Sequence, residues 1–149
     1  MIRAATMDDV GALVSLARTF HATTPYRDQL HFDGGRMQTS IEATLADENA
    51  HLLVLDDLKG AFAFEVYRSP IGADLIASER IWFVLPEARG RGVALVKRAM
   101  RDAKALGATV FSLSAPDALG EVHAGTLHAR RSLPSLRTFA RRGLGRVAT

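Results

Sequence analysis

Residues 81–94 constrain the fold of this chain more than any other stretch, because three kinds of local structure follow one another within them. An apolar run typical of a β-strand ends at Pro86, a short basic loop with two glycines follows, and an amphipathic helical pattern then begins. The first backbone N–H groups of a helix lack partners within the helix, so such a junction can bind an anion. We expect Gly90 and Gly92 to provide the open φ values and the close backbone approach that an anion-binding loop needs.

The length and composition of the chain fit a single globular domain that spans residues 1–149. No apolar run reaches the roughly 18 residues of a membrane-spanning helix, and acidic residues stand where a secretory signal would be apolar. The chain has no cysteine, which excludes disulfides, a thiol nucleophile and thiolate metal ligands and fits a reducing cytoplasm. We therefore expect a cytoplasmic protein that does not bind membranes.

Charge is distributed unevenly along the chain. Residues 1–75 hold 6 Lys and Arg against 11 Asp and Glu, a net charge of −5, whereas residues 76–149 hold 13 against 5, a net charge of +8. A basic half favours an anionic partner, either a phosphorylated cofactor or a nucleic acid. A solvated arginine-rich surface explains the C-terminal arginines equally well.

The hydrophobic periodicity predicts strands and helices in a mixed order. Strands are expected at residues 2–5, 51–55, 61–67, 75–85 and 108–114, and helices at 7–20, 35–46 and 92–106. After Pro116 the pattern weakens, and we predict a short helix over residues 132–143 and a short last strand over residues 144–149. This order predicts a mixed α/β layer arrangement.

The spacing Arg89-x-x-Gly92-x-Ala94 is the arginine version of the signature Q/R-x-x-G-x-G/A. On this point the chain resembles the GNAT superfamily of acetyl-CoA-dependent N-acetyltransferases, in element order along nearly its whole length and in residues mainly over 78–115. The resemblance implies an α/β (α+β, mixed-sheet) fold with a mostly antiparallel central sheet and helices on both faces. The stretches 24–26 and 82–92 look most like small acetyltransferase-like proteins of phage and prophage genomes.

The resemblance also implies that acetyl-CoA is the co-substrate and that this region binds it. Free backbone groups of the strand, which in GNAT proteins is bulged and splayed, would pair with the pantetheine arm at Phe83, Val84 and Leu85. The N–H of Val84 would polarise the thioester carbonyl. The pyrophosphate would be held by the loop and the helix start, namely by Arg89, Gly90, Arg91, Gly92, Val93 and Ala94.

Catalytic residues are harder to assign than cofactor contacts. Glu79 stands about where some GNAT enzymes place a general base, although a strand glutamate paired with a neighbouring arginine is the simpler interpretation. His21, Tyr26 and His31 are candidates for the acceptor side, and each is more often a packing or surface residue. The family commonly has a tyrosine just before the glycine that ends the last helix, where this chain has Phe139. No metal site is expected from the sequence.

The sequence leaves three functions open. The first is an N-acetyltransferase that transfers the acetyl group directly, in a ternary complex, to a primary amine of a small molecule or a peptide. The second is a GNAT-like CoA-binding module with little or no turnover, suggested by Phe139 and by a short C-terminus. Whichever function holds, many family members add a further strand after that glycine, and a homodimer is an alternative way to complete the sheet edge. The third, a nucleic-acid-binding protein, ranks last because the arginine-rich segment has one aromatic residue and no recognisable reading motif.

Overall fold

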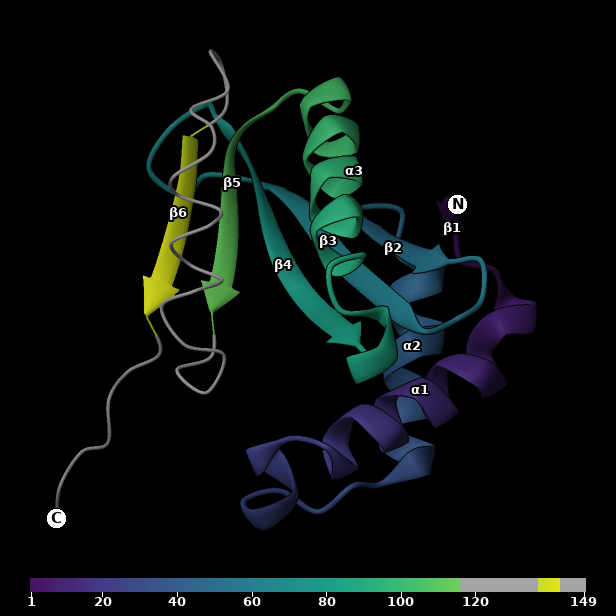
Figure 1. Ribbon diagram of the computed structural model, residues 1–149. Helices are drawn as coiled ribbons and strands as arrows, with labels where there is room; N and C mark the ends of the chain where they lie inside the picture. Colours follow the sequence, from purple (N-terminus) through teal and green to yellow (C-terminus); the bar gives the residue numbers. More distant parts are fainter. Residues whose placement is uncertain (116–136, 143–149) are drawn as a thin grey trace, which may run out of the picture.

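The computed structural model describes residues 1–115 and 137–142, and within them the chain forms a six-stranded sheet in the order β1-β2-β3-β4-β5-β6 (Figure 1). The strands are β1 (Ile2–Ala4), β2 (Ala50–Leu55), β3 (Gly60–Arg68), β4 (Leu75–Val84), β5 (Ala108–Ala115) and β6 (Arg137–Arg142). The helices are α1 (Val10–Ala22), α2 (Gly34–Ala46) and α3 (Gly92–Ala105), and short 3-10 turns are η1 (Met7–Asp9), η2 (Pro25–Asp28) and η3 (Pro86–Ala88).

The sheet is mixed. Strands β1 to β4 pair antiparallel with their sequence neighbours, whereas β4 pairs parallel with β5 and β5 pairs parallel with β6. Helix α3 connects the parallel pair β4–β5 and covers one face, while α1 and α2 cover the other (Figure 1). The predicted α+β architecture, with a mostly antiparallel sheet and helices on both faces, is therefore confirmed.

The two faces of the sheet have separate hydrophobic cores, because successive side chains of a strand point to opposite sides. On β3, Phe62 and Phe64 are fully buried beneath α3, and Ala61 and Ala63 face α1 and α2. The bulky side chains thus fill the α3 side, and the small ones let the helix pair approach the other side closely.

A charged cluster anchors the start of the first helical segment. Asp9 is 7% exposed, and its Oδ2 accepts the backbone N–H of Thr6 at 2.8 Å. The guanidinium of Arg3 donates to both carboxylate oxygens of Asp9, at 2.7 and 2.8 Å, and this pairing holds the pKa of Asp9 well below its usual range. A threonine followed three residues later by an acidic residue predicts a helix start of this kind, and the structure confirms it at Thr6 and Asp9.

Two sequence expectations about helices need correction. The helix predicted over residues 132–143 is wrong for the described part, because residues 137–142 form β6, whose register with β5 runs from Val110↔Arg137 to Ala115↔Arg142. Pairing along β5 satisfies this segment's backbone hydrogen bonds, and that tertiary gain outweighs a weak local helical pattern. The strand predicted over residues 144–149 lies outside the described residues.

The buried face of α3 also differs from the predicted one. Helical spacing in the sequence predicts a buried stripe of Val93, Val96, Met100 and Ala103, whereas the residues that the structure buries are Gly92, Leu95, Val96, Ala99 and Ala103. The helix is therefore rotated so that its first glycine, rather than Val93, faces the sheet. No helix within residues 1–115 and 137–142 is long and apolar enough to cross a bilayer.

Candidate active site

Strands β4 and β5 pair over only part of their length. Their register runs from Leu75↔Ala108 to Ser78↔Ser112, yet β4 continues to Val84. The two strands diverge toward their C-terminal ends in Figure 1, while β5 stays paired with β6. The last six residues of β4, 79–84, thus leave the parallel pairing and run toward the N-terminus of α3.

An irregularity in β4 marks the point of divergence. Ala63 on β3 pairs with Ile81 and Phe64 pairs with Glu79, so Arg80 is an extra residue on β4. A bulge of this kind bends a strand and increases its twist. The GNAT resemblance implied a bulge and a splay in this strand, and the structure contains both.

Hydrogen bonding determines which backbone groups of β4 face the divergence. The N–H of Leu85 donates to the carbonyl of Lys59 at 2.9 Å, and the carbonyl of Leu85 accepts from Ala88 at 2.9 Å. In an antiparallel pair, the backbone N–H and C=O groups of successive residues point alternately toward the partner strand and away from it. Phe83, like Leu85, therefore directs its backbone groups to β3, whereas Trp82 and Val84 direct theirs toward β5. Of the three residues that sequence reasoning selected, only Val84 has backbone groups facing the opening, and Trp82 was missed.

The loop and the start of α3 present unpaired backbone donors. The N–H groups of Arg89, Arg91 and Ala94 bond to carbonyls of the loop itself. In the described part of the chain, no acceptor is recorded for the backbone N–H groups of Gly90, Gly92 and Val93. Helix α3 also has no side chain capping its N-terminus, so its positive end is open to an anion.

The two glycines of the loop are required for different reasons. Gly90 has φ +90°, a left-handed conformation that side chains rarely adopt, and a Cβ there would meet nothing within 4 Å. Gly92 is not among the glycines of positive φ, but a Cβ on it would lie 3.0 Å from Val84 Cγ2 and 3.3 Å from Trp82 Nε1. Sequence reasoning assigned conformational freedom and close approach to both, whereas the structure divides these roles between them.

The two arginines of the loop are in different environments. Arg91 Nη1 donates to Oδ2 of Asp57, a residue of the β2–β3 turn, at 2.6 Å, and this bond lowers the pKa of Asp57. Arg89 is exposed, and within residues 1–115 and 137–142 no hydrogen bond or ion pair is recorded for its side chain. Arg89 is therefore the more available cation.

Trp82 lies against the beginning of α3. Its ring makes an edge contact with Phe62, with centroids 6.0 Å apart, and its Nε1 is buried with no hydrogen-bond partner among the described residues. A buried donor without a partner destabilises the folded protein. This donor lies directly beneath Gly92. This tryptophan, the only one in the chain, sits beside the loop and can report on events there.

Glu79 is half-buried and is the first residue of β4 beyond its last pair with β5. It therefore lies at the point where the strands begin to separate. It pairs with Phe64, so its side chain is on the α3 side of the sheet, and its catalytic role stays a prediction from the sequence. The neighbouring Arg80 pairs with Glu65, at 3.5 Å, and with Asp47, at 4.0 Å.

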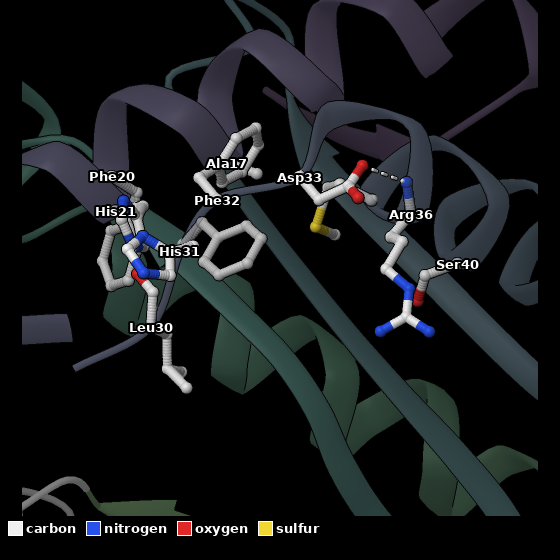
Figure 2. Close-up of a pocket in the computed structure, with 11 residues that line it drawn as sticks. Ala17, Phe20, His21, Leu30, His31, Phe32, Asp33, Arg36 and Ser40 are labelled. Atoms are coloured by element: carbon white, nitrogen blue, oxygen red, sulfur yellow. Dashed lines mark hydrogen bonds between the residues drawn. The ribbon is translucent and has the colours of Figure 1, made fainter. Parts of the chain in front are cut away.

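A cavity of about 410 Å³ lies on the α1–α2 side of β4. The end of α1, the connection to α2 and the first turns of α2 form most of it (Figure 2). Phe83 of β4 also contributes to its lining. Its apolar lining consists of Ala17, Phe20, Leu30, Phe32, Met37 and Phe83, and its polar lining of His21, His31, Asp33, Arg36 and Ser40. Two of the acceptor-side candidates, His21 and His31, are thus brought together here.

Two contacts order the aromatic part of this cavity. The rings of Phe20 and Phe83 lie 4.9 Å apart, which joins α1 to β4. His21 Nε2 lies 2.6 Å from the carbonyl oxygen of Leu30, and since a carbonyl only accepts, Nε2 carries the proton. In the neutral ring Nδ1 is then an acceptor. Sequence reasoning missed the three phenylalanines, although Phe20 stood out as the last apolar position of the first helix.

Several other sequence candidates lie where the structure gives no side-chain account. Tyr26, the third candidate for the acceptor side, lies in η2. Phe139 is in β6, so residues 137–142 do not form the helix on which it was matched to the family tyrosine. Within the described ranges, no group of three His, Asp or Glu side chains is gathered as a metal site.

Comparison with known proteins identifies the fold but not a sequence relative. No protein-family model matches the chain, and no curated protein matches it. A transcriptional regulator from Bacillus halodurans C-125 is 17% identical, with a TM-score of 0.74 and coverage of 98% of this chain and 97% of that one. A predicted acetyltransferase from Clostridium acetobutylicum, solved with acetyl-CoA, is 16% identical, with a TM-score of 0.67 and coverage of 89% and 91%.

A third similar structure is an aminoglycoside acetyltransferase from an uncultured soil metagenomic sample, in complex with sisomicin. It is 14% identical, with a TM-score of 0.68 and coverage of 100% of this chain and 95% of that one. The chain therefore has the fold of GNAT acetyltransferases, at an identity that establishes the fold alone. The comparisons do not support the narrower resemblance to phage and prophage proteins.

Proposed function

We propose that this protein is an N-acetyltransferase that transfers the acetyl group of acetyl-CoA directly to a primary amine in a ternary complex. The observation that carries the proposal is the continuity between two features. The edge of β4 from Arg80 to Val84, which pairs with no strand of the described residues on the β5 side, leads through the glycine loop to the uncapped N-terminus of α3. A ligand with an amide-containing arm and a pyrophosphate matches this row of backbone groups in order.

Each part of the row has a role in the proposal. The outward backbone groups of Trp82 and Val84 pair with the pantetheine arm, and the N–H of Val84 polarises the thioester carbonyl. The N–H groups of Gly90, Gly92 and Val93 hold the pyrophosphate, and the exposed guanidinium of Arg89 neutralises part of its negative charge. Leu85 contributes no backbone group, because both of its groups are already engaged.

The amine enters from the cavity that holds His21, His31 and Phe83. A lysine-like amine has a pKa of about 10.4, so its deprotonation at pH 7 costs about 4–5 kcal/mol. Glu79 faces the α3 side of the sheet, like its cross-strand partner Phe64, so in this proposal it accepts that proton through water in the opening between β4 and β5. The amine nitrogen attacks the carbonyl carbon and the C–S bond breaks. The CoA thiolate leaves with little assistance near neutral pH.

Binding of acetyl-CoA is tested by titration calorimetry and by the fluorescence of Trp82. We expect micromolar affinity and a change in emission, because Trp82 borders the binding row. The absence of heat and of a fluorescence change with both acetyl-CoA and CoA would exclude the proposal.

Turnover is tested by thiol release with a panel of amines. Glu79→Gln should lower kcat by about 10²–10⁴-fold near pH 7, and the deficit should shrink at higher pH as free amine accumulates. Glu65→Gln, on the adjacent strand, is the matched control and should leave kcat unchanged. A Glu79→Gln variant with wild-type kcat would remove Glu79 from the mechanism.

A further inference from the structure

The cavity between α1, α2 and β4 has a lining that selects among amines, and its chemistry goes beyond the reaction class. Three phenylalanines and two histidines contribute to it, so aromatic rings form much of its wall. Figure 2 shows Phe20, His21, Leu30 and His31 at one end and Asp33, Arg36 and Ser40 at the other. A cavity of about 410 Å³ is within the range of small-molecule sites.

The charge around the cavity does not suit a polycation. Asp33 is the one carboxylate among the described lining residues, and its Oδ1 accepts the N–H of Arg36 at 3.0 Å as the cap of α2. Two guanidinium groups outnumber this carboxylate. Arg36 lines the cavity, and the guanidinium of Arg18 lies 4.8 Å from the centre of the Phe32 ring. An aminoglycoside or a polyamine carries several positive charges, and recognising them requires an excess of carboxylates.

We propose that the acceptor is a monoamine with an aromatic body, and this inference rests on the acetyltransferase function proposed above. The ring of the substrate packs among Phe20, Phe32 and Phe83, in the tilted or offset arrangements that aromatic pairs favour. Phe83 connects this aromatic wall to β4, so a ring held there keeps its amine close to Val84. The Nδ1 of His21 is an acceptor available to the amine at the aromatic end.

The experiment compares kcat/KM for 2-phenylethylamine and tryptamine with kcat/KM for spermidine and sisomicin, with acetyl-CoA saturating. We expect the aromatic monoamines to be favoured at least tenfold. Binding of 2-phenylethylamine to the CoA-loaded protein is followed by saturation-transfer NMR, so the inference is tested even where turnover is slow. Calorimetry with acetyl-CoA alone is run in parallel.

Two variants separate the aromatic and the charge arguments. Phe32→Leu keeps an apolar side chain but removes the ring, and should lower kcat/KM for tryptamine at least fivefold without changing the Kd of acetyl-CoA. Arg36→Glu adds a carboxylate at the third position of α2, where an acidic residue is favourable to the helix, and should raise the ratio of spermidine to 2-phenylethylamine turnover at least tenfold. Ile71→Ala, at an exposed turn remote from the cavity, should change neither.

The outcomes distinguish this inference from the function beneath it. A protein that binds acetyl-CoA but prefers spermidine or sisomicin, or that shows no NMR contact with 2-phenylethylamine, overturns the aromatic-monoamine assignment and leaves the acetyltransferase intact. A protein that binds neither acetyl-CoA nor CoA overturns both. Preference for aromatic monoamines together with the Arg36→Glu shift supports the assignment.

Discussion

The most direct test of the site's geometry is the replacement of Gly92, because the structure gives a steric reason for the absence of a side chain at this position. A Cβ there would lie 3.0 Å from Val84 Cγ2 and 3.3 Å from Trp82 Nε1, whereas comfortable carbon contacts are about 3.5–4.0 Å. The overlap is therefore about half an ångström, on a β-branched neighbour whose rotamer is stiff.

The magnitude follows from two opposing effects. Replacing glycine by alanine in a helix gains up to about 1 kcal/mol, while overfilling a packed site costs about 1–3 kcal/mol. Gly92→Ala should therefore be neutral or destabilising by up to about 2 kcal/mol, and Gly92→Val should be worse. Gly11 is the matched control, because it too lies in the first turn of a helix but a Cβ there would meet nothing within 4 Å. Gly11→Ala should stabilise by about 0.5–1 kcal/mol.

The consequence for the cofactor is larger than the consequence for stability. Displacing the start of α3 by a few tenths of an ångström weakens the alignment of its free N–H groups, and one hydrogen bond to a charged group contributes about 1.5–3 kcal/mol. Since about 1.4 kcal/mol is a factor of ten in Kd, Gly92→Val should weaken acetyl-CoA binding at least tenfold. Thermal melts of the two alanine variants and calorimetry of all three measure these effects. If Gly92→Val binds acetyl-CoA within twofold of the wild type, the steric reasoning is refuted.

Three further predictions follow from individual contacts. Arg89→Ala should raise the Kd of acetyl-CoA more than Arg91→Ala does, because Arg91 is paired with Asp57. Calorimetry at two salt concentrations should show that Arg89→Ala reduces the salt dependence of this Kd more than Arg91→Ala does. Equal effects of the two substitutions would contradict this. Asp9→Asn should lower the free energy of unfolding by about 1–3 kcal/mol at pH 7 in urea titrations. Arg3 lowers the pKa of Asp9 in the folded protein. The contribution of Asp9 to the free energy of unfolding is therefore full above its unfolded pKa of about 4 and declines below it. If wild type and Asp9→Asn differ in this free energy by the same amount at pH 7 and pH 3, the pairing is contradicted. Trp82→Phe removes a buried donor that has no partner among the described residues and should change stability by no more than about 1 kcal/mol. A loss above about 3 kcal/mol in urea titrations would contradict this.

Much of the fold could be read from local patterns. The strand–loop–helix junction at residues 81–94, the helix that follows it and the β2–β3 hairpin are encoded by period, glycine placement and a proline. These signals are local, so the sequence carries them without reference to the rest of the chain. The segment 137–142 illustrates the limit, because its strand conformation depends on pairing with β5.

The candidate site was predictable to a different extent on its two sides. The cofactor side was largely visible in the sequence, since Gly90, Gly92 and Arg89 stand at fixed spacing. The sequence did not show which backbone groups of β4 point away from β3. This depends on how the residues of β3 and β4 are paired and on the extra residue Arg80. Similarly, Gly92 shows its steric role only once Trp82 packs beneath it.

The stretch 81–94 by itself determined that a strand would run through a glycine loop into a helix whose first N–H groups are free. This follows from short-range chemistry, namely φ preference, helix termini and periodicity. Only the tertiary structure decided where β4 separates from β5 and which rings gather beside it, because Phe20, Phe32 and Phe83 come from three segments distant in sequence. Contacts between distant segments arise from packing the two faces of one sheet, and no local pattern specifies them.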